Sequence, residues 1–263
     1  MVMIADVMRY LEREAPLEDA ESWDNVGLLM GDPEASVTSI MTCLTITDAV
    51  VGEALERGVQ LVVTHHPMPF QPLNRLTTDR LPGRHVWRLA TRSIAVYSSH
   101  TAFDSAVNGI NQTMAESLEL QEVAPLLPFD PPRPSLGAGR HGRLDPERPL
   151  GELADRIKGL FDGAPLRVAG DPARHVARVA LACGAGGSFL DAALEHQCDV
   201  LITGEATFHT VLEGLDSGAA MILTGHYTSE RFAMELLAQR LQQHFPDLSI
   251  WPSQAEQPPW QTW

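Results

Sequence analysis

Three short apolar runs in this sequence each lead into a histidine, and this arrangement constrains the fold more than any other feature. The runs and their endings are Leu61-Val62-Val63 before Thr64-His65-His66, Ile94-Ala95-Val96-Tyr97 before Ser98-Ser99-His100, and Met221-Ile222-Leu223 before Thr224-Gly225-His226. Such runs predict buried strands. In an open α/β sheet, sites form outside the carboxyl ends of the strands. We therefore expect the three ends to converge and to hold metal.

The segments between these runs predict helices, so the chain has the pattern of β-α-β units. Residues 40–44 predict a strand, and Asp48–Arg57 a helix that Thr47 or Asp48 caps and Gly58 ends. The strand at Leu61 follows, which predicts a parallel pair with a right-handed crossover. Further helices are expected at 83–92, 108–118 and 231–245.

An internal sequence repeat indicates that this pattern occurs twice. Residues 54–64 align without gaps on residues 193–203, an offset of 139 residues. The same offset places the strand at Ile40 on one that begins at Val179. Chance similarity between two buried β-α-β units is the alternative to a duplicated fold. In the duplicated fold, the second half carries Glu205 where the first carries His66, and the proline-rich segment 125–134 marks a linker or domain edge.

The residues that follow the strand ends suit metal binding. Asp104 comes four residues after His100, and Glu230 comes four residues after His226. If a helix begins near residue 228, His226 and Glu230 project toward one region, and a carboxylate there can bridge two cations about 3.5–4 Å apart. Imidazole with carboxylate favours Zn, Mn, Fe or Ni over Ca or Mg.

Other polar features are less specific. The turn-rich stretch 21–33 contains Trp23 and predicts a fixed loop near a site. The glycine-rich stretch 183–188 is either a phosphate-cradling turn or a closely packed strand-to-helix turn. His209 lies four residues beyond Glu205 and can reach the cavity as a proton donor or substrate contact. The remaining histidines are expected at the surface: His85, His141, His175, His196 and His244.

Composition excludes several classes of protein. The formal net charge of −15, from 19 basic and 34 acidic residues, argues against a nucleic-acid or anionic-membrane partner. The three cysteines lack CxxC spacing, which predicts buried free thiols in a reducing compartment. The first ten residues lack the apolar centre of a signal peptide, and no apolar run is long enough to span a membrane. We expect a cytoplasmic location.

The motifs together resemble one family. They are Ser22-Trp23-Asp24-Asn25-Val26-Gly27, Thr64-His65-His66-Pro67, His100-Thr101-Ala102-Phe103-Asp104, Gly184-Ala185-Gly186, Thr203-Gly204-Glu205 with His209, and Gly225-His226-Tyr227-Thr228-Ser229-Glu230. In collinear order over about residues 3–250, this set resembles the GTP cyclohydrolase 1 type 2 homolog family, the NGG-interacting-factor-three-like dinuclear-metal proteins.

The resemblance implies a fold and a metal centre. The fold would be α/β, layered αβα, with two related domains: a metal-binding domain at 1–128 plus 226–263 and an inserted second domain at 129–225. The chains would form a homohexameric toroid. Two divalent metal ions per chain would be held by the implied ligands His65, His66, Asp104, His226 and Glu230. Glu230 would bridge the ions, and His100 would be a near neighbour of the pair.

One departure from the family is visible, since members usually have Asp where this chain has Thr45. Thr45 is not an implied ligand, so we expect a lost substrate contact rather than a lost metal.

The expected function is that of a metal-dependent hydrolase resembling GTP cyclohydrolase 1 type 2. Metal-activated water would attack GTP or another nucleotide or phosphoester, with Glu205, His209 and His100 as the candidate acid-base residues. The alternative is a non-enzymatic hexameric toroid that handles metal or binds a partner, because a fold and a metal pair do not fix a substrate.

Overall fold

The computed structural model describes residues 1–129, 133 and 135–260, and it divides into two compact units. Unit 1 comprises Met1–Phe103 and Arg231–Pro259, and unit 2 comprises Asp104–Glu230 and Trp260. Unit 2 is therefore an insertion in unit 1 along the chain. Parts of the proline-rich segment, residues 130–132 and 134, lie outside the described residues.

Both boundaries between the units differ from the expected positions. The first lies before residue 128, because β7 (Gln121–Ala124) already pairs with β10 (Arg140–Pro149) in the sheet of unit 2. The second lies after residue 225, because the first turn of α9 (His226–His244) bonds to unit 2: Ser229 Oγ accepts the Gly184 N–H at 2.9 Å.

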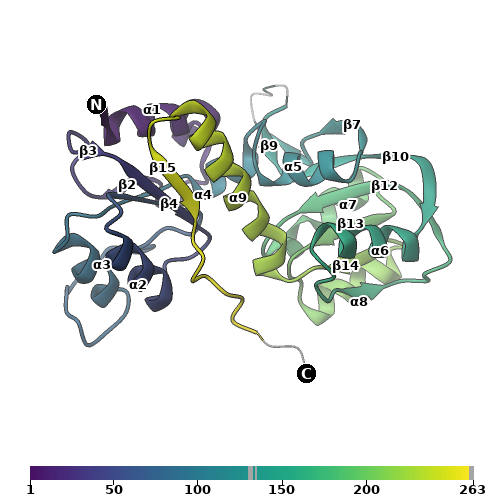
Figure 1. Ribbon diagram of the computed structural model, residues 1–263. Helices are drawn as coiled ribbons and strands as arrows, with labels where there is room; N and C mark the ends of the chain where they lie inside the picture. Colours follow the sequence, from purple (N-terminus) through teal and green to yellow (C-terminus); the bar gives the residue numbers. More distant parts are fainter. Residues whose placement is uncertain (130–132, 134, 261–263) are drawn as a thin grey trace. The chain divides into compact units, whose positions relative to one another are not determined.

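Unit 1 is built on a five-stranded sheet in the order β15-β4-β5-β6-β2 (Figure 1). The strands are β2 (Gly27–Met30), β4 (Ser39–Cys43), β5 (Leu61–Thr64), β6 (Ala95–Ser98) and β15 (Ser249–Pro252). Four of them are parallel, and β2 runs antiparallel to β6 at one edge. A separate short pair joins β1 (Val2–Met3) to β3 (Ser36–Val37).

Helices cover both faces of this sheet, and its central strands are therefore buried on both sides. Met41 and Val62 pack with α2 (Asp48–Arg57) and α3 (Gly83–Ala90) on one face. On the other face, Thr42 donates to the Met234 carbonyl of α9 at 2.7 Å. There α1 (Ile4–Glu14) meets α9, with Tyr10 stacked on His244. The predicted αβα layering is confirmed (Figure 1).

The local signals for α2 act as the sequence predicted. Thr47 Oγ1 accepts the Val50 N–H at the start of the helix, and Gly58 ends it with a left-handed φ of 62°. This capping fixes where α2 begins and ends between β4 and β5.

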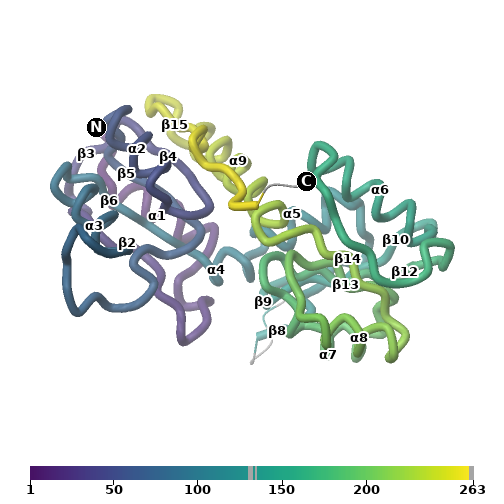
Figure 2. Tube along the Cα trace, turned by 90° about the horizontal axis from the view of Figure 1, so that it is seen from below, coloured from purple at the N-terminus to yellow at the C-terminus, as the bar shows by residue number. Residues whose placement is uncertain are grey.

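Unit 2 has a six-stranded sheet in the order β11-β14-β13-β12-β10-β7 (Figure 2). Besides β7 and β10, its strands are β11 (Arg167–Ala169), β12 (His175–Ala182), β13 (Val200–Thr203) and β14 (Ala220–Leu223). The central strands β12, β13 and β14 are parallel. The short strands β8 (Leu127–Pro128) and β9 (Gly137–Ala138) pair separately. The helices are α5 (Ile110–Ser117), α6 (Leu150–Leu160), α7 (Leu190–Glu195) and α8 (Phe208–Asp216).

The two units repeat one β-α-β-α-β pattern in the same register. Ile40 pairs with Leu61 between β4 and β5, and Val179 pairs with Val200 between β12 and β13, 139 residues later in each case. An antiparallel edge strand then completes each set, β2 beside β6 and β11 beside β14. The offset of 139 residues in the internal sequence repeat therefore also relates these paired strands.

The repeat extends to the residues after the strands. Thr64 Oγ1 donates to the His66 carbonyl at 3.1 Å, and Thr203 Oγ1 lies 3.5 Å from the Glu205 carbonyl. Glu205 therefore occupies in unit 2 the position that His66 occupies in unit 1.

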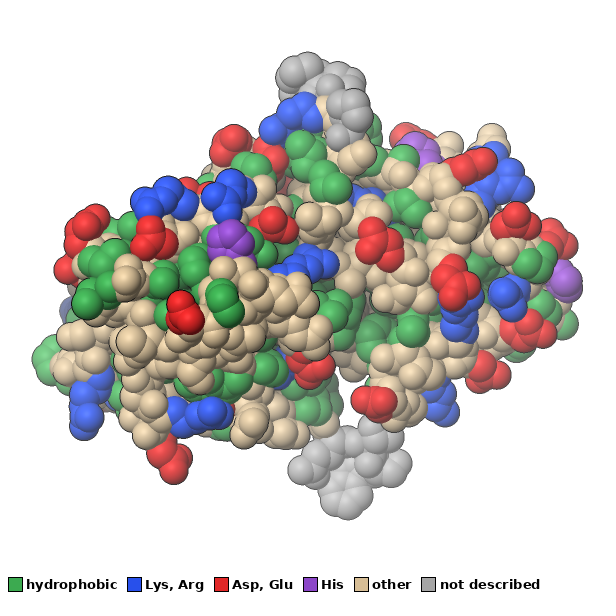
Figure 3. Space-filling model, turned by 45° about the horizontal axis from the view of Figure 1, so that its top comes forward, with side chains coloured by type: hydrophobic (Ala, Val, Ile, Leu, Met, Phe, Trp, Pro, Cys, Tyr) green, Lys and Arg blue, Asp and Glu red, His purple; other side chains and the backbone are tan. Residues whose placement is uncertain are grey.

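On the face drawn in Figure 3, the acidic and basic side chains of the described residues are scattered among apolar and neutral ones. Among the described residues, none of the helices has the length and apolar character needed to cross a bilayer.

Candidate functional site

Three imidazoles meet at the carboxyl edge of the unit 1 sheet. Thr64 and Ser98 are partners at the ends of the parallel strands β5 and β6, so the residues that follow them emerge side by side. The ring centroids of His65 and His66 are 5.1 Å apart, and those of His65 and His100 are 5.0 Å apart. Candidate ligand atoms of all three lie within 4.8 Å of one another.

Backbone hydrogen bonds hold the histidine pair where the strand ends. The N–H groups of His65 and His66 donate to the carbonyls of Cys43 and Leu44 at 3.0 and 2.9 Å. Ser98 Oγ donates to the His65 carbonyl at 2.6 Å. These bonds let adjacent residues, which alternate sides in a regular strand, turn toward one region.

Asp24 orients His100. Its carboxylate is fully buried, lies 2.8 Å from His100 Nδ1 and accepts the Thr101 hydroxyl at 2.6 Å. Burial alone would raise the pKa of Asp24, but the hydrogen bonds from His100 and Thr101 and the charge of His100 hold it well below its ordinary value. The contact between Nδ1 and the Asp24 carboxylate fixes the orientation of the His100 ring. The loop around Trp23 is thus fixed beside the histidines, as the sequence predicted.

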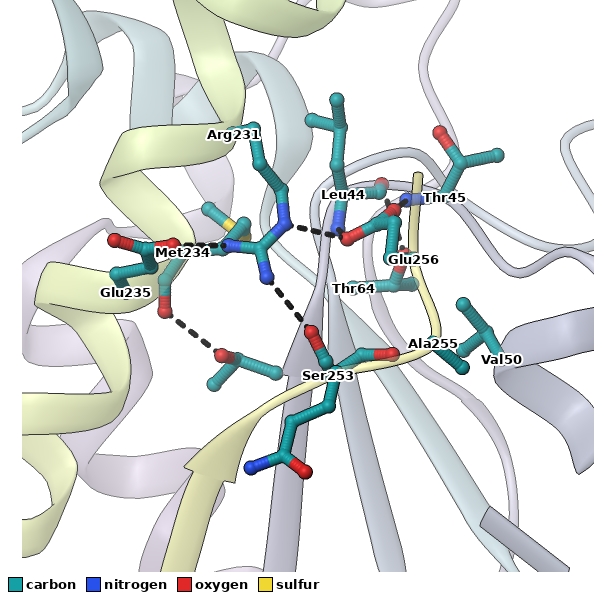
Figure 4. Close-up of polar contacts among 12 residues, drawn as sticks. Leu44, Thr45, Val50, Thr64, Arg231, Met234, Glu235, Ser253, Ala255 and Glu256 are labelled. Carbon is teal, nitrogen blue, oxygen red and sulfur yellow. Dashed lines mark hydrogen bonds and ion pairs between the residues drawn. The ribbon is translucent and has the colours of Figure 1, made fainter. Parts of the chain in front are cut away.

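A buried carboxylate from the C-terminal segment holds the loop at residues 44–45, which precedes α2 (Figure 4). Glu256, whose side chain is 2% exposed, accepts the backbone N–H groups of Leu44 and Thr45 at 2.9 and 2.7 Å. Thr45 Oγ1 lies 2.7 Å from His66 Nδ1. Arg231 Nε lies 2.8 Å from the same carboxylate. Thr45 therefore contacts a candidate metal ligand.

In unit 2, the first turn of α9 presents a histidine–carboxylate pair. The helix begins at His226, slightly before the position expected near residue 228. His226 Nε2 lies 3.1 Å from Glu230 Oε2, and His226 Nδ1 lies 3.4 Å from Glu205 Oε2. The hydrogen bond with Glu230 raises the pKa of His226 to about 9 against the opposing effect of burial, and Glu205 adds to the rise.

The absence of a side chain at Gly184 leaves space for the His226–Glu230 pair. A Cβ atom there would lie 2.1 Å from Glu230 Oε1 and 3.5 Å from His226 Nε2, and φ is +68°. The N–H groups of Gly184 and Gly186 are bonded within unit 2, to Ser229 Oγ and Thr203 Oγ1. Of the two readings of this glycine-rich stretch, the structure favours the closely packed turn.

Asp104 is the first residue of unit 2 along the chain. It lies on α4 (His100–Ser105), and its carbonyl accepts the Asn111 side-chain N–H, while Asn111 Oδ1 accepts the Cys183 N–H. Burial, followed by the charges of Glu230 and Asp104, raises the pKa of Cys183 well above its ordinary value. His209 is exposed on α8 with its ring against Phe208.

Arg140 supports the segment that carries Asp104. It is fully buried and donates to the carbonyls of Ser105 and Ala106, at 3.2 and 2.8 Å, where α4 ends. It also donates to the carbonyls of Gly137 and Gly139, each at 2.7 Å. Burial lowers its pKa to about 10, so it remains charged at neutral pH. The supporting roles of Arg140 and Glu256 were not predicted from the sequence. Their partners are backbone carbonyl and N–H groups, which every residue has, so no local motif indicates these contacts.

The fold and these groups define a class of two-unit α/β protein whose strand ends carry a histidine cluster in one unit and a histidine–carboxylate pair in the other. The chain belongs to the Duf34/NIF3 (NGG1p interacting factor 3) family, whose model matches residues 2–259. The family expected from the motifs is therefore confirmed.

Named relatives cover most of the chain. A "GTP cyclohydrolase 1 type 2 homolog" of Clostridium acetobutylicum is 33% identical over 91% of this chain and 89% of its own. "NIF3-like protein 1" of Drosophila melanogaster is 34% identical over 87% and 78%. Among solved structures, Staphylococcus aureus protein SA1388 matches with a TM-score of 0.89 at 25% identity, covering 99% of each chain. A Bacillus cereus protein related to NIF3 shares the fold, with a TM-score of 0.90 at 21% identity over 100% and 99%.

Proposed function

We propose that this protein is a metal-dependent hydrolase that acts on a nucleotide or phosphoester and binds two divalent metal ions per chain. The ligands would be His65 and His66 from unit 1 and Asp104, His226 and Glu230 from unit 2, with Glu230 shared by both ions. The observation that carries the proposal is the cluster of three imidazoles at the ends of β5 and β6, with candidate ligand atoms within 4.8 Å of one another.

The chemistry of these candidate ligand atoms suits a centre of two divalent metal ions. Imidazole nitrogens and carboxylate oxygens together suit Zn, Mn, Fe or Ni. The missing Cβ of Gly184 leaves room for Glu230 Oε1 and His226 Nε2. The chain passes between its two units at Phe103–Asp104 and at Glu230–Arg231, so a proposed ligand adjoins each crossing. Membership of a family with members named GTP cyclohydrolase 1 type 2 homolog supports a nucleotide as substrate.

When bound, the metal pair would supply a hydroxide near neutral pH and steady the developing oxyanion. The chain's own residues would place and move protons. His100, held at Nδ1 by Asp24, would donate or accept at Nε2. Glu205, half exposed and 3.4 Å from His226, would exchange protons with solvent. We propose His209 as a more distant proton donor from the exposed first turn of α8.

Metal reconstitution tests the centre. Elemental analysis should give about two equivalents of Zn, Mn, Fe or Ni per chain. His65→Ala and His66→Ala should each lower this ratio, and the matched control His175→Ala, at an exposed histidine of unit 2, should not. A ceiling of one equivalent at saturating metal would refute the dinuclear centre.

Turnover tests the reaction. The loaded protein should hydrolyse GTP or another nucleotide, and His100→Gln should slow the reaction while keeping both metals. Binding of two readily exchanged metals with no turnover across a nucleotide and phosphoester panel would favour the non-enzymatic alternative.

A further inference from the structure

Two exposed aromatic side chains flank the histidine cluster of unit 1. Trp23 is 57% exposed and Phe70 is 40% exposed. Their ring centroids are 6.1 Å apart at an interplanar angle of 64°. Both rings also meet His100 edge-on, with centroids 6.2 and 6.5 Å from that of the imidazole.

The loops that carry these rings are held in place. The Asn25 side chain donates to the Pro69 carbonyl at 2.7 Å, which ties the Trp23 loop to the Phe70 loop. The Glu21 N–H donates to Thr101 Oγ1 at 2.9 Å, which ties the Trp23 loop to α4. The exposed rings are therefore preorganised, and a ligand that stacks on them would spend little free energy on ordering the loops.

The geometry suits a flat ring with polar edges. Aromatic faces bind planar rings by offset or edge-to-face contact, and an exposed pair set at a steep angle can contact both the face and the edge of a ligand. The adjoining His100 can hydrogen-bond a ring nitrogen or carbonyl through Nε2. A purely aliphatic ligand would use neither the ring faces nor this polar neighbour.

We propose that Trp23 and Phe70 form a binding site for a fused nitrogen heterocycle, such as a purine or pterin ring, beside His65, His66 and His100. As a statement about substrate, this rests on the proposed hydrolase function, and it identifies the ring as the part of the substrate that unit 1 recognises. The site would contact the face and the edge of the ring beside the imidazoles.

Calorimetric titration of the full chain with guanosine and with pterin tests the site, and ribose 5-phosphate serves as the ring-free control. At least one ring compound should bind and the control should not. Trp23→Ala should weaken binding about tenfold or more, and Trp23→Phe should retain most of it. The matched control is Trp87→Ala, which removes another exposed tryptophan of unit 1, 48% exposed on α3, and should bind as the wild type does.

Three outcomes would overturn the site: no binding of either ring compound at millimolar concentration, equal weakening in Trp23→Ala and Trp87→Ala, or unchanged ring binding in Trp23→Ala. If unchanged binding comes with a smaller particle mass by light scattering, the pair is a contact between copies of the chain. Melting temperatures exclude misfolding. Metal equivalents are measured on the same samples, so failure of the metal centre and failure of the ring site are seen separately.

Discussion

Replacing Glu256 with glutamine should destabilise unit 1 and weaken metal binding at His66 together. The carboxylate is nearly fully buried, accepts two backbone N–H groups and pairs with Arg231. Glutamine keeps the volume but offers one oxygen and one NH₂ group, so the NH₂ must face a donor: an amide of Leu44 or Thr45, or the guanidinium.

The magnitude follows from these contacts. A hydrogen bond to a charged group contributes about 1.5–3 kcal/mol, and breaking a buried ion pair by removing one partner costs about 3–5 kcal/mol. A loss near the overlap, about 3 kcal/mol in the free energy of unfolding, corresponds to a fall of about 6–12 °C in melting temperature for a chain of this size. Loss of the support that Thr45 gives His66 should weaken metal binding by about 10–100-fold.

Glu53→Gln is the matched control. Glu53 has an 8% exposed side chain and holds the same C-terminal segment, accepting from Ser253 Oγ and the Gln254 and Ala255 N–H groups. That variant should also lower the melting temperature but leave metal affinity unchanged, because Glu53 does not hold the amides of residues 44–45. The two readouts are differential scanning fluorimetry and competitive metal titration. A wild-type melting temperature in Glu256→Gln, or an equal loss of metal affinity in both variants, would refute the reasoning.

Three further predictions concern the proposed ligands and the C-terminal segment. Glu230→Gln should empty at least one metal site, whereas His65→Ala should weaken mainly one, and two tightly bound ions in Glu230→Gln alongside none in His65→Ala would contradict the bridging role. Gly184→Ala should weaken metal binding at least tenfold because its Cβ would lie 2.1 Å from Glu230 Oε1, and Gly218→Ala, with φ +84° and open space around it, should not. Burial alone would raise the pKa of Glu53, but hydrogen bonds led by Ser253 lower it below its ordinary value. Its stabilisation is therefore present above the ordinary pKa of a glutamate and is lost as the pH falls through the lowered pKa of the folded state. The difference in melting temperature between wild type and Glu53→Gln should narrow as the pH is lowered from 7 into this range, and a constant difference would exclude the effect.

Much of unit 1 could be predicted because its signals are local. The capped helix Asp48–Arg57 has the predicted bounds, and β5 and β6 lie at or within one residue of the apolar runs. β10 was not predicted, because Arg140–Pro149 has little apolar alternation and contains two prolines. Its pairing with β7 and β12 depends on the rest of the sheet of unit 2.

The residues of the candidate site likewise fall into those that could be predicted from local sequence and those that could not. The histidines after β5 and β6 were found because strand ends are visible in the sequence. Asp24, which orients His100, is 76 residues away along the chain, and Glu256 is 211 residues from Thr45. Such partners are brought together by tertiary packing, and no periodic sequence pattern predicts them. For the same reason the surface prediction for His85 is wrong: it is 5% exposed, against Asp48.

The insertion of unit 2 sets the order in which the chain can be completed on the ribosome. Residues Asp104–Glu230 are contiguous and can fold as soon as they emerge, whereas unit 1 waits for its last strand, β15, and for most of α9. Glu256 comes later still. During synthesis the usual N-terminal-first order is therefore reversed: the inserted unit matures first, and the loop at residues 44–45 is secured only when Glu256 has emerged. A nascent chain stalled or truncated after residue 248 would carry a finished unit 2 and an unfinished unit 1, with the loop at residues 44–45 not yet secured.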